Sequence, residues 1–166
     1  MKELSSIQQK LFDKLHNERK NDYKVFSKPD YAGVWKGIID KYPDSAHFIY
    51  ELLQNADDAE ATNVYIQLSK EKLLFKHNGK KHFDVTDCYD QSIKQGDINA
   101  ITGIGNSTKS DNYNKIGKFG VGFKAVFQYT DNPEIYDDVF KFKIKNYIIP
   151  ELIKYGWKND GARPGY

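Results

Sequence analysis

The chain has 166 residues, of which 39% are hydrophobic and 29% are charged, as is typical of one globular domain with a sizeable core. The formal net charge of +2 gives no electrostatic indication of a nucleic-acid partner. No apolar run approaches the roughly 20 residues of a membrane span, and the first residues lack the apolar segment of a secretory signal. A single cysteine, Cys88, excludes an internal disulfide. We therefore expect a cytoplasmic protein with no membrane association.

The first third of the chain has helical periodicity. Apolar residues at helical spacing predict an amphipathic helix over residues 3–19. Its face should be formed by Ile7, Leu11 and Leu15. A second helix is expected over residues 31–41, and a third from a cap at Asp44 or Ser45 through Ala59. The apolar face of the third helix should comprise Phe48, Ile49, Leu52, Leu53 and Ala56.

The pattern then changes to that of strands. Residues 61–69 alternate apolar and polar side chains, residues 69–72 form a turn, and residues 73–79 return as a second strand. This predicts an antiparallel hairpin directly after a helix. Helices and a mostly antiparallel sheet in separate runs indicate the α+β class.

The second half is less regular. Residues 84–115 are polar, with short helical pieces expected at 85–89 and 97–101. A connection of this length inside a compact domain is usually a functional lid or a disordered segment. Residues 123–129 should form a helix, and residues 139–149 alternate as a strand. The last residues have the composition of a loop or tail.

A glycine-rich stretch, KIGKFGVGF, occupies residues 115–123. Its glycines are Gly117, Gly120 and Gly122, and glycines crowd in this way where a backbone approaches a ligand such as phosphate. Phe119 stands where a Walker loop needs Ser or Thr, and the glycine order is the reverse of the dinucleotide fingerprint. Taken alone, the stretch is either a phosphate-binding loop or a glycine-rich turn before a helix. Lys118 or Lys124 could add charge, or could simply be solvated.

Three polar residues interrupt the predicted third helix. Glu51, Asn55 and Asp58 are spaced by four and three residues and therefore share one stripe of the helix. The amide oxygen of Asn55 suits a hard cation such as Mg²⁺, and the Glu51 carboxylate can accept a proton from water. The alternative is a solvated helix face.

Read in order, ELLQNADDA, the hairpin ending in HNG, GIGNSTK and GKFGVGF resemble the GHKL superfamily. This superfamily includes gyrase B, the large heat-shock chaperone, histidine kinases and MutL, which share the Bergerat ATP-binding fold. The closest resemblance is to its sacsin-like branch, and it covers roughly residues 30–150. The fold so implied is a two-layer sandwich of helices on a mostly antiparallel sheet.

The resemblance implies a role for each matching residue. Glu51 corresponds to the general base that activates water, and Asn55 to the magnesium ligand. The implied nucleotide-binding residues are Asn55, Asp58, His77, Asn78, Gly79, Asn106, Ser107, Thr108, Lys109, Gly117, Lys118, Phe119, Gly120, Val121, Gly122 and Phe123. Histidine kinases of this superfamily do not usually carry the base, so Glu51 favours hydrolysis.

The first glycine box departs from the family pattern. His77 stands where the family has the Asp that accepts a hydrogen bond from the adenine amino group, and Lys81 replaces the second glycine. A neutral imidazole can accept one hydrogen bond, depending on its tautomer, but it does not copy a carboxylate.

The resemblance implies an ATPase of low turnover with ATP and Mg²⁺ as its ligands, in which lid closure is coupled to rearrangement of a partner or attached domain. A nucleotide-binding sensor without catalysis, or a protein-interaction module, is the alternative. We expect a helical extension over residues 1–30, the ATP-binding domain over 31–150 with its lid at about 84–115, and a tail or the start of a further region over 151–166. The family's last strands are not recognisable before Tyr166, which predicts an N-terminal fragment of a larger protein or a trimmed version of the fold. An incomplete sheet would have an open edge that invites self-association or a protein partner.

Overall fold

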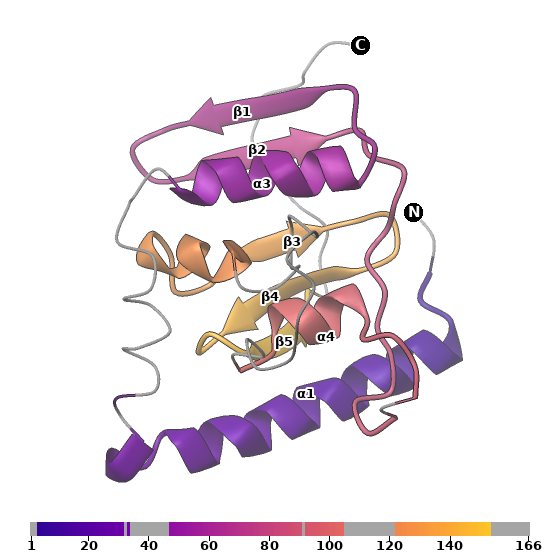
Figure 1. Ribbon diagram of the computed structural model, residues 1–166, viewed down its shortest axis with the longest axis vertical. Coiled ribbons are helices and arrows are strands. Elements are labelled where there is room, and N and C mark those ends of the chain that lie inside the picture. Colours follow the sequence, from indigo (N-terminus) through magenta and orange to yellow (C-terminus); the bar gives the residue numbers. More distant parts are fainter. Residues whose placement is uncertain (1–2, 32, 34–46, 91, 105–121, 154–166) are drawn as a thin grey trace.

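The computed structural model describes residues 3–31, 33, 47–90, 92–104 and 122–153 (Figure 1). In chain order its elements are α1 (Ser6–Phe26), the 3₁₀ helix η1 (Pro29–Tyr31), α3 (His47–Asp58), β1 (Val64–Leu68), β2 (Leu73–His77), α4 (Asp97–Ile101), the 3₁₀ helix η2 (Gly122–Gln128), β3 (Glu134–Tyr136), β4 (Lys141–Lys145) and β5 (Ile149–Leu152). The strands form two antiparallel sheets, β1–β2 and β3–β4–β5. The predicted α+β class is confirmed.

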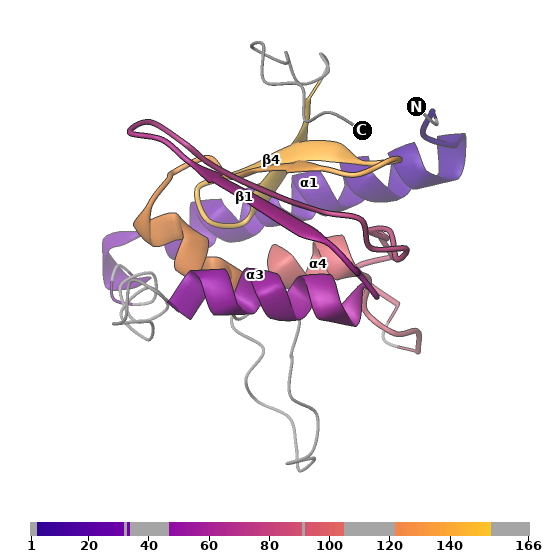
Figure 2. The ribbon, with the colours of Figure 1, turned by 90° about the horizontal axis from the view of Figure 1, so that it is seen from above.

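The strands and most helices occupy different layers. Figure 2 shows the strands of both sheets on one side of the molecule and α3 and α4 on the other. Helix α1 packs against β5, and α3 packs against η2. The chain thus covers its short sheets with helices, as an α+β domain must to bury their apolar faces.

Helix α1 begins with a capping box in which Ser5 and Gln8 bond each other's backbone N–H groups. The helix is confirmed but runs to Phe26, seven residues beyond the predicted end. Leu15 is buried as expected, whereas Ile7 is 69% exposed and Phe12 is buried instead. The buried face is therefore rotated away from the predicted one.

One core joins α1 to the sheet of β3–β5. It consists of Phe12, Leu15, Val85, Ile98, Ile101, Phe127, Phe140, Phe142 and Ile144. The Phe12 ring lies 6.0 Å from that of Phe140 and 5.9 Å from that of Phe142, measured between centroids. Val85 and Ile98, from the segment expected to form a lid, belong to this same core. The predicted domain and lid boundaries stay predictions.

The hairpin and the helix before it match the sequence pattern. Strands β1 and β2 pair with Ile66 opposite Phe75, and the turn at residues 69–72 joins them. Helix α3 ends one residue before the predicted end, and its Phe48 and Ala56 are buried. Leu53 was expected on the apolar face but is 38% exposed.

The helix expected over residues 123–129 is present as the 3₁₀ helix η2. Two local predictions were wrong: residues 85–89 form no helix, and the strand expected over residues 139–149 is divided by a turn between β4 and β5. A tight turn joins β4 to β5, because Asn146 and Tyr147 adopt left-handed backbone angles, with φ of 50° and 68°. Strand β3 was not predicted. Most of the predicted second helix lies outside the described residues.

Helix α3 ends in a Schellman motif with glutamate at the glycine position. Ala61 N–H bonds to the Ala56 carbonyl, Glu60 N–H bonds to the Asp57 carbonyl, and Glu60 has a φ of 61°. A residue with a Cβ is strained in this left-handed conformation. We therefore expect Glu60→Gly to raise the free energy of unfolding by about 1 kcal/mol in urea denaturation.

Glu60→Ala is the matched control for this prediction. It also removes the carboxylate that lies 3.7 Å from the Lys81 ammonium, but it keeps the strained Cβ. An equal gain in Glu60→Ala would show that the strain explanation is wrong.

Candidate functional site

The predicted site residues fall into two groups. Outside the described residues lie Asn106, Ser107, Thr108, Lys109, Gly117, Lys118, Phe119, Gly120 and Val121. The remaining ones belong to α3, to the end of β2 and to the start of η2. Their placement shows which of the sequence motifs the fold brings together.

The polar stripe of α3 is half-buried. Glu51, Asn55 and Asp58 all have intermediate exposure, in contrast to Asp57 on the outer face. Within the described part of the chain, none of these three side chains makes a hydrogen bond or an ion pair. Their polar groups are therefore open to water, as on a solvated helix face, or to a polar ligand.

The residues after β2 are hydrogen-bonded to the end of α3. Lys80 N–H donates to the Ala59 carbonyl over 2.8 Å, and the Lys81 ammonium donates to the Asp58 carbonyl. A Cβ added at Gly79 would lie 2.7 Å from the Ala59 Cβ, so the glycine is needed for this close approach. Lys81 therefore has a structural role, since it satisfies a carbonyl at the negative end of the helix.

The Asn78 side chain is hydrogen-bonded to the loop that joins α3 to β1. Its amide oxygen accepts hydrogen bonds from the backbone N–H groups of Thr62 and Asn63, at 3.0 and 2.9 Å. Its amide nitrogen donates to the Thr62 hydroxyl. These bonds hold the first glycine box and the α3–β1 loop together, and the predicted ligand role of Asn78 stays a prediction.

The His77 ring has a defined hydrogen-bonding pattern. Gly79 N–H donates to Nδ1 over 3.1 Å, so this nitrogen is the acceptor. Burial lowers the pKa of His77, against a smaller opposite effect of Asp137. A neutral imidazole with Nδ1 as acceptor carries its proton on Nε2. Position 77 therefore offers a hydrogen-bond donor, where the Asp of the family pattern offers an acceptor.

The start of η2 is anchored by Lys124, the second residue after Gly122. Its ammonium is buried and donates to the Tyr147 carbonyl over 2.6 Å, next to the Phe127 ring. Desolvation, with a contribution from the positive charge of Arg19, lowers the pKa of Lys124 to about 7. Neither sequence-level option, a phosphate contact or a solvated side chain, anticipated this anchor to the β4–β5 turn.

Helix α3 packs against η2, whose residues follow the glycine loop. The Phe48 ring at the start of α3 lies 4.5 Å from the Tyr129 ring just after η2. Gly122 and Phe123 open η2, and Phe123 is half-buried. Gly79 of the first glycine motif lies against Ala59 at the end of α3, and η2, which follows the second motif, packs against α3. Helix α3 therefore lies between the described ends of the two glycine motifs.

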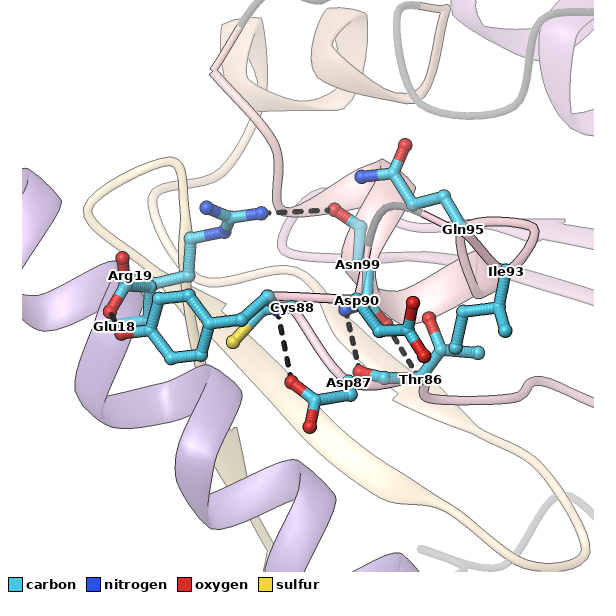
Figure 3. Close-up of a pocket in the computed structure, with 10 residues that line it drawn as sticks. Glu18, Arg19, Thr86, Asp87, Cys88, Asp90, Ile93, Gln95 and Asn99 are labelled. Atoms are coloured by element: carbon cyan, nitrogen blue, oxygen red, sulfur yellow. Dashed lines mark hydrogen bonds between the residues drawn. The ribbon is translucent and has the colours of Figure 1, made fainter.

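A pocket of about 390 Å³ is lined by none of the predicted site residues (Figure 3). Its lining consists of Glu18, Arg19, Thr86, Asp87, Cys88, Tyr89, Asp90, Ile93, Gln95 and Asn99.

Most charged groups at this pocket are already paired. Asp87 pairs with Lys14 at 2.6 Å, which lowers the pKa of its carboxyl, and Arg19 pairs with Asp22. The Tyr89 hydroxyl donates to Glu18. The Lys14–Asp87 and Tyr89–Glu18 contacts join the segment around residue 88 to α1.

Within the described residues, no helix combines the length and apolar content needed to cross a lipid bilayer. The same part of the chain contains no group of three or more His, Cys, Asp and Glu side chains placed to hold a metal ion. A cation at α3 would therefore take at most two such side chains from the described residues.

Comparisons with known proteins extend this description. The chain is 35% identical to Protein NO VEIN of Arabidopsis thaliana over 124 residues, which are 68% of this chain and 4% of that protein. It is 35% identical to human sacsin over 108 residues, which are 60% of this chain and 2% of sacsin. It is 27% identical to the chaperone protein HtpG of Wigglesworthia glossinidia brevipalpis over 132 residues, which are 66% of this chain and 21% of HtpG.

The chain thus spans only a small part of the length of these relatives. None of the solved structures matches it. The model of the sacsin domain matches residues 28–145, a range that includes α3, the hairpin and η2. This confirms the resemblance to the sacsin-like branch found in the sequence motifs. The chain belongs to the sacsin domain family.

Proposed function

We propose that this chain binds ATP with Mg²⁺ and hydrolyses it slowly, and that turnover drives rearrangement of a protein partner or an attached domain. The observation that carries the proposal is the half-buried stripe of Glu51, Asn55 and Asp58, whose side chains make no hydrogen bond or ion pair within the described residues. The sacsin domain match and the similarity to the chaperone HtpG support it.

Each residue of the stripe has a chemical role in this proposal. The Asn55 amide oxygen fits a hard cation, and a Mg²⁺ ion typically takes few protein ligands and completes its shell with phosphate oxygens and water. When bound, Mg²⁺ neutralises charge that develops on the phosphates. Glu51, one helical turn before Asn55, takes the proton of the attacking water.

A nucleotide-binding module without hydrolysis is the second candidate. The donor at His77 and the use of Lys81 as a cap of α3 favour it, because both depart from the ATP-binding pattern of the superfamily. In this case nucleotide binding would act as a signal to a partner and no phosphate would be released.

Calorimetry with ATP and Mg²⁺, combined with a phosphate-release assay, separates these candidates. Binding with slow release of phosphate supports the ATPase, and binding without release supports the sensor. If no nucleotide binds, both are wrong and a protein-interaction module remains.

Changing His77 should alter base selectivity. We expect His77→Asp to raise the affinity for ATP relative to ITP roughly tenfold, because a carboxylate accepts a hydrogen bond from the adenine amino group. ITP carries a carbonyl at that position and suits the Nε2 donor of the wild type. Competition binding with both nucleotides measures the ratio.

His77→Ala is the control for this selectivity. It removes the imidazole donor without adding an acceptor, and should not produce the preference for ATP that aspartate does. An unchanged ratio in His77→Asp would mean that residue 77 does not contact the base.

A further inference from the structure

The outer edge of β1 is free for pairing within the described part of the chain. Strand β1 pairs with β2 alone there, and Figure 1 shows it as the outermost strand. Asn78 N–H donates to the Asn63 carbonyl, and Ser69 N–H donates to the Lys72 carbonyl. These two hydrogen-bonded pairs lie at both ends of the β1–β2 ladder.

The position of these pairs tells which backbone groups point outward. Hydrogen-bonded pairs recur at every second residue of an antiparallel ladder, so Tyr65 and Gln67 also bond to β2. It follows that the N–H and C=O groups of Val64, Ile66 and Leu68 point away from β2. They are the unpaired donors and acceptors of the free edge.

The same three residues carry exposed apolar side chains. Val64 is 39% exposed, Ile66 is 42% exposed and Leu68 is 78% exposed. All five residues of β1 are uncharged. An uncharged edge strand without Lys, Pro or a bulge lacks the usual protection against pairing with another strand.

The edges of the other sheet are protected. Strand β5 contains Pro150, whose carbonyl lies 2.8 Å from Nδ1 of His16, and α1 packs against this strand. Strand β3 carries Glu134. Strand β2 also has an edge without a strand partner in the two-stranded sheet, but it carries Lys76 and His77. These differences make β1 the described strand best suited to extend its sheet by pairing with another chain.

We propose that two copies of this chain associate by antiparallel pairing of their β1 strands around a twofold axis at Ile66. In this register Ile66 lies opposite Ile66 of the second copy, and Val64 lies opposite Leu68. Each of these pairs consists of residues with outward backbone groups, so each can exchange two hydrogen bonds. A second β1 fits because the strand is uncharged and its apolar edge residues are symmetric about Ile66.

The pairing also gives the exposed side chains a common apolar surface. Residues directly opposite each other in a ladder lie on the same face, so Val64, Ile66 and Leu68 share a face with Phe75 of β2. In the dimer this face continues into the corresponding residues of the second copy. The association needs no nucleotide and is independent of the proposed function.

Light scattering coupled to size exclusion, over a range of protein concentrations, tests the proposal. The wild type should elute with twice the mass of the chain at high concentration. Ile66→Pro should elute with the mass of one chain, because it removes an outward N–H but no β1–β2 hydrogen bond. Ile66→Val, which keeps this N–H, should remain dimeric.

A second variant keeps the test valid if the proline variant does not fold. Ile66→Lys keeps the backbone intact and places two ammonium groups opposite each other at the axis, so we expect loss of the dimer with an unchanged circular dichroism spectrum. A wild type that is monomeric at every concentration would overturn the proposal. So would a dimer that persists in both Ile66→Pro and Ile66→Lys.

Discussion

Glu51→Gln should lower the rate of ATP hydrolysis by roughly 10²- to 10⁴-fold while ATP binding persists, since this is the usual contribution of a general base. The glutamine amide has nearly the same shape as the carboxylate but cannot take a proton from water. Glu51 makes no ion pair or hydrogen bond within the described residues, so the change should leave the stability of α3 intact. Phosphate release under saturating ATP and Mg²⁺ measures the loss, and calorimetry measures the binding.

Glu60→Gln, just after the C-terminal end of α3, provides the matched control. The Glu60 side chain is 62% exposed and lies outside the polar stripe, so its replacement should leave turnover unchanged. Equal turnover in Glu51→Gln and the wild type would refute the assignment of the base. Loss of ATP binding in Glu51→Gln would instead place Glu51 in the binding of the nucleotide.

The free energy of unfolding should rise by about 2 kcal/mol between pH 7 and pH 9 because of Lys124. The pKa of this buried ammonium is lowered from 10.5 to about 7 in the folded chain. Between these two values the unfolded chain binds more protons than the folded one, so stability increases with pH. The cost of burying the charge is fully present below pH 7 and disappears as the pH approaches 10.5.

Lys124→Met isolates this contribution. Methionine fills a similar volume and does not titrate, so the pH dependence of this variant should be flatter by the contribution of Lys124. The Cys88 thiol and the other titrating groups are common to both proteins and cancel in the comparison. Urea denaturation at pH 7, 8 and 9 gives the two slopes, and identical slopes would show that Lys124 keeps its charge in the folded state.

Much of the fold could be predicted because its signals are local. Helix α1 has its capping box at Ser5, and the hairpin of β1 and β2 has an alternating pattern interrupted by a polar turn. The family could be recognised for a similar reason, since α3 and the glycine motifs carry characteristic residues at characteristic spacings. The sacsin domain match confirms that recognition. The roles of Glu51 and Asn55 remain predictions that the experiments above address.

The errors arose where distant contacts outweigh local preference. Residues 85–89 could form a helical turn, but Thr86 bonds through its backbone to both ends of the Asn99 amide, and Asp87 pairs with Lys14. This segment is therefore held against α4 and α1 and forms only a single turn at residues 87–90. The turn at Asn146 and Tyr147 was missed because neither residue is a glycine, although both adopt left-handed angles.

The sequence by itself determined the class of the fold, its main helices, the hairpin and the membership of a family. Periodicity and motif spacing depend only on the order of residues along the chain. The tertiary structure alone decided the acceptor state of Nδ1 in His77, the capping of α3 by Lys81 and the burial of the Lys124 ammonium. It also decided which backbone groups of β1 point away from β2. Each of these depends on distances across the fold, and a short-range pattern does not contain them.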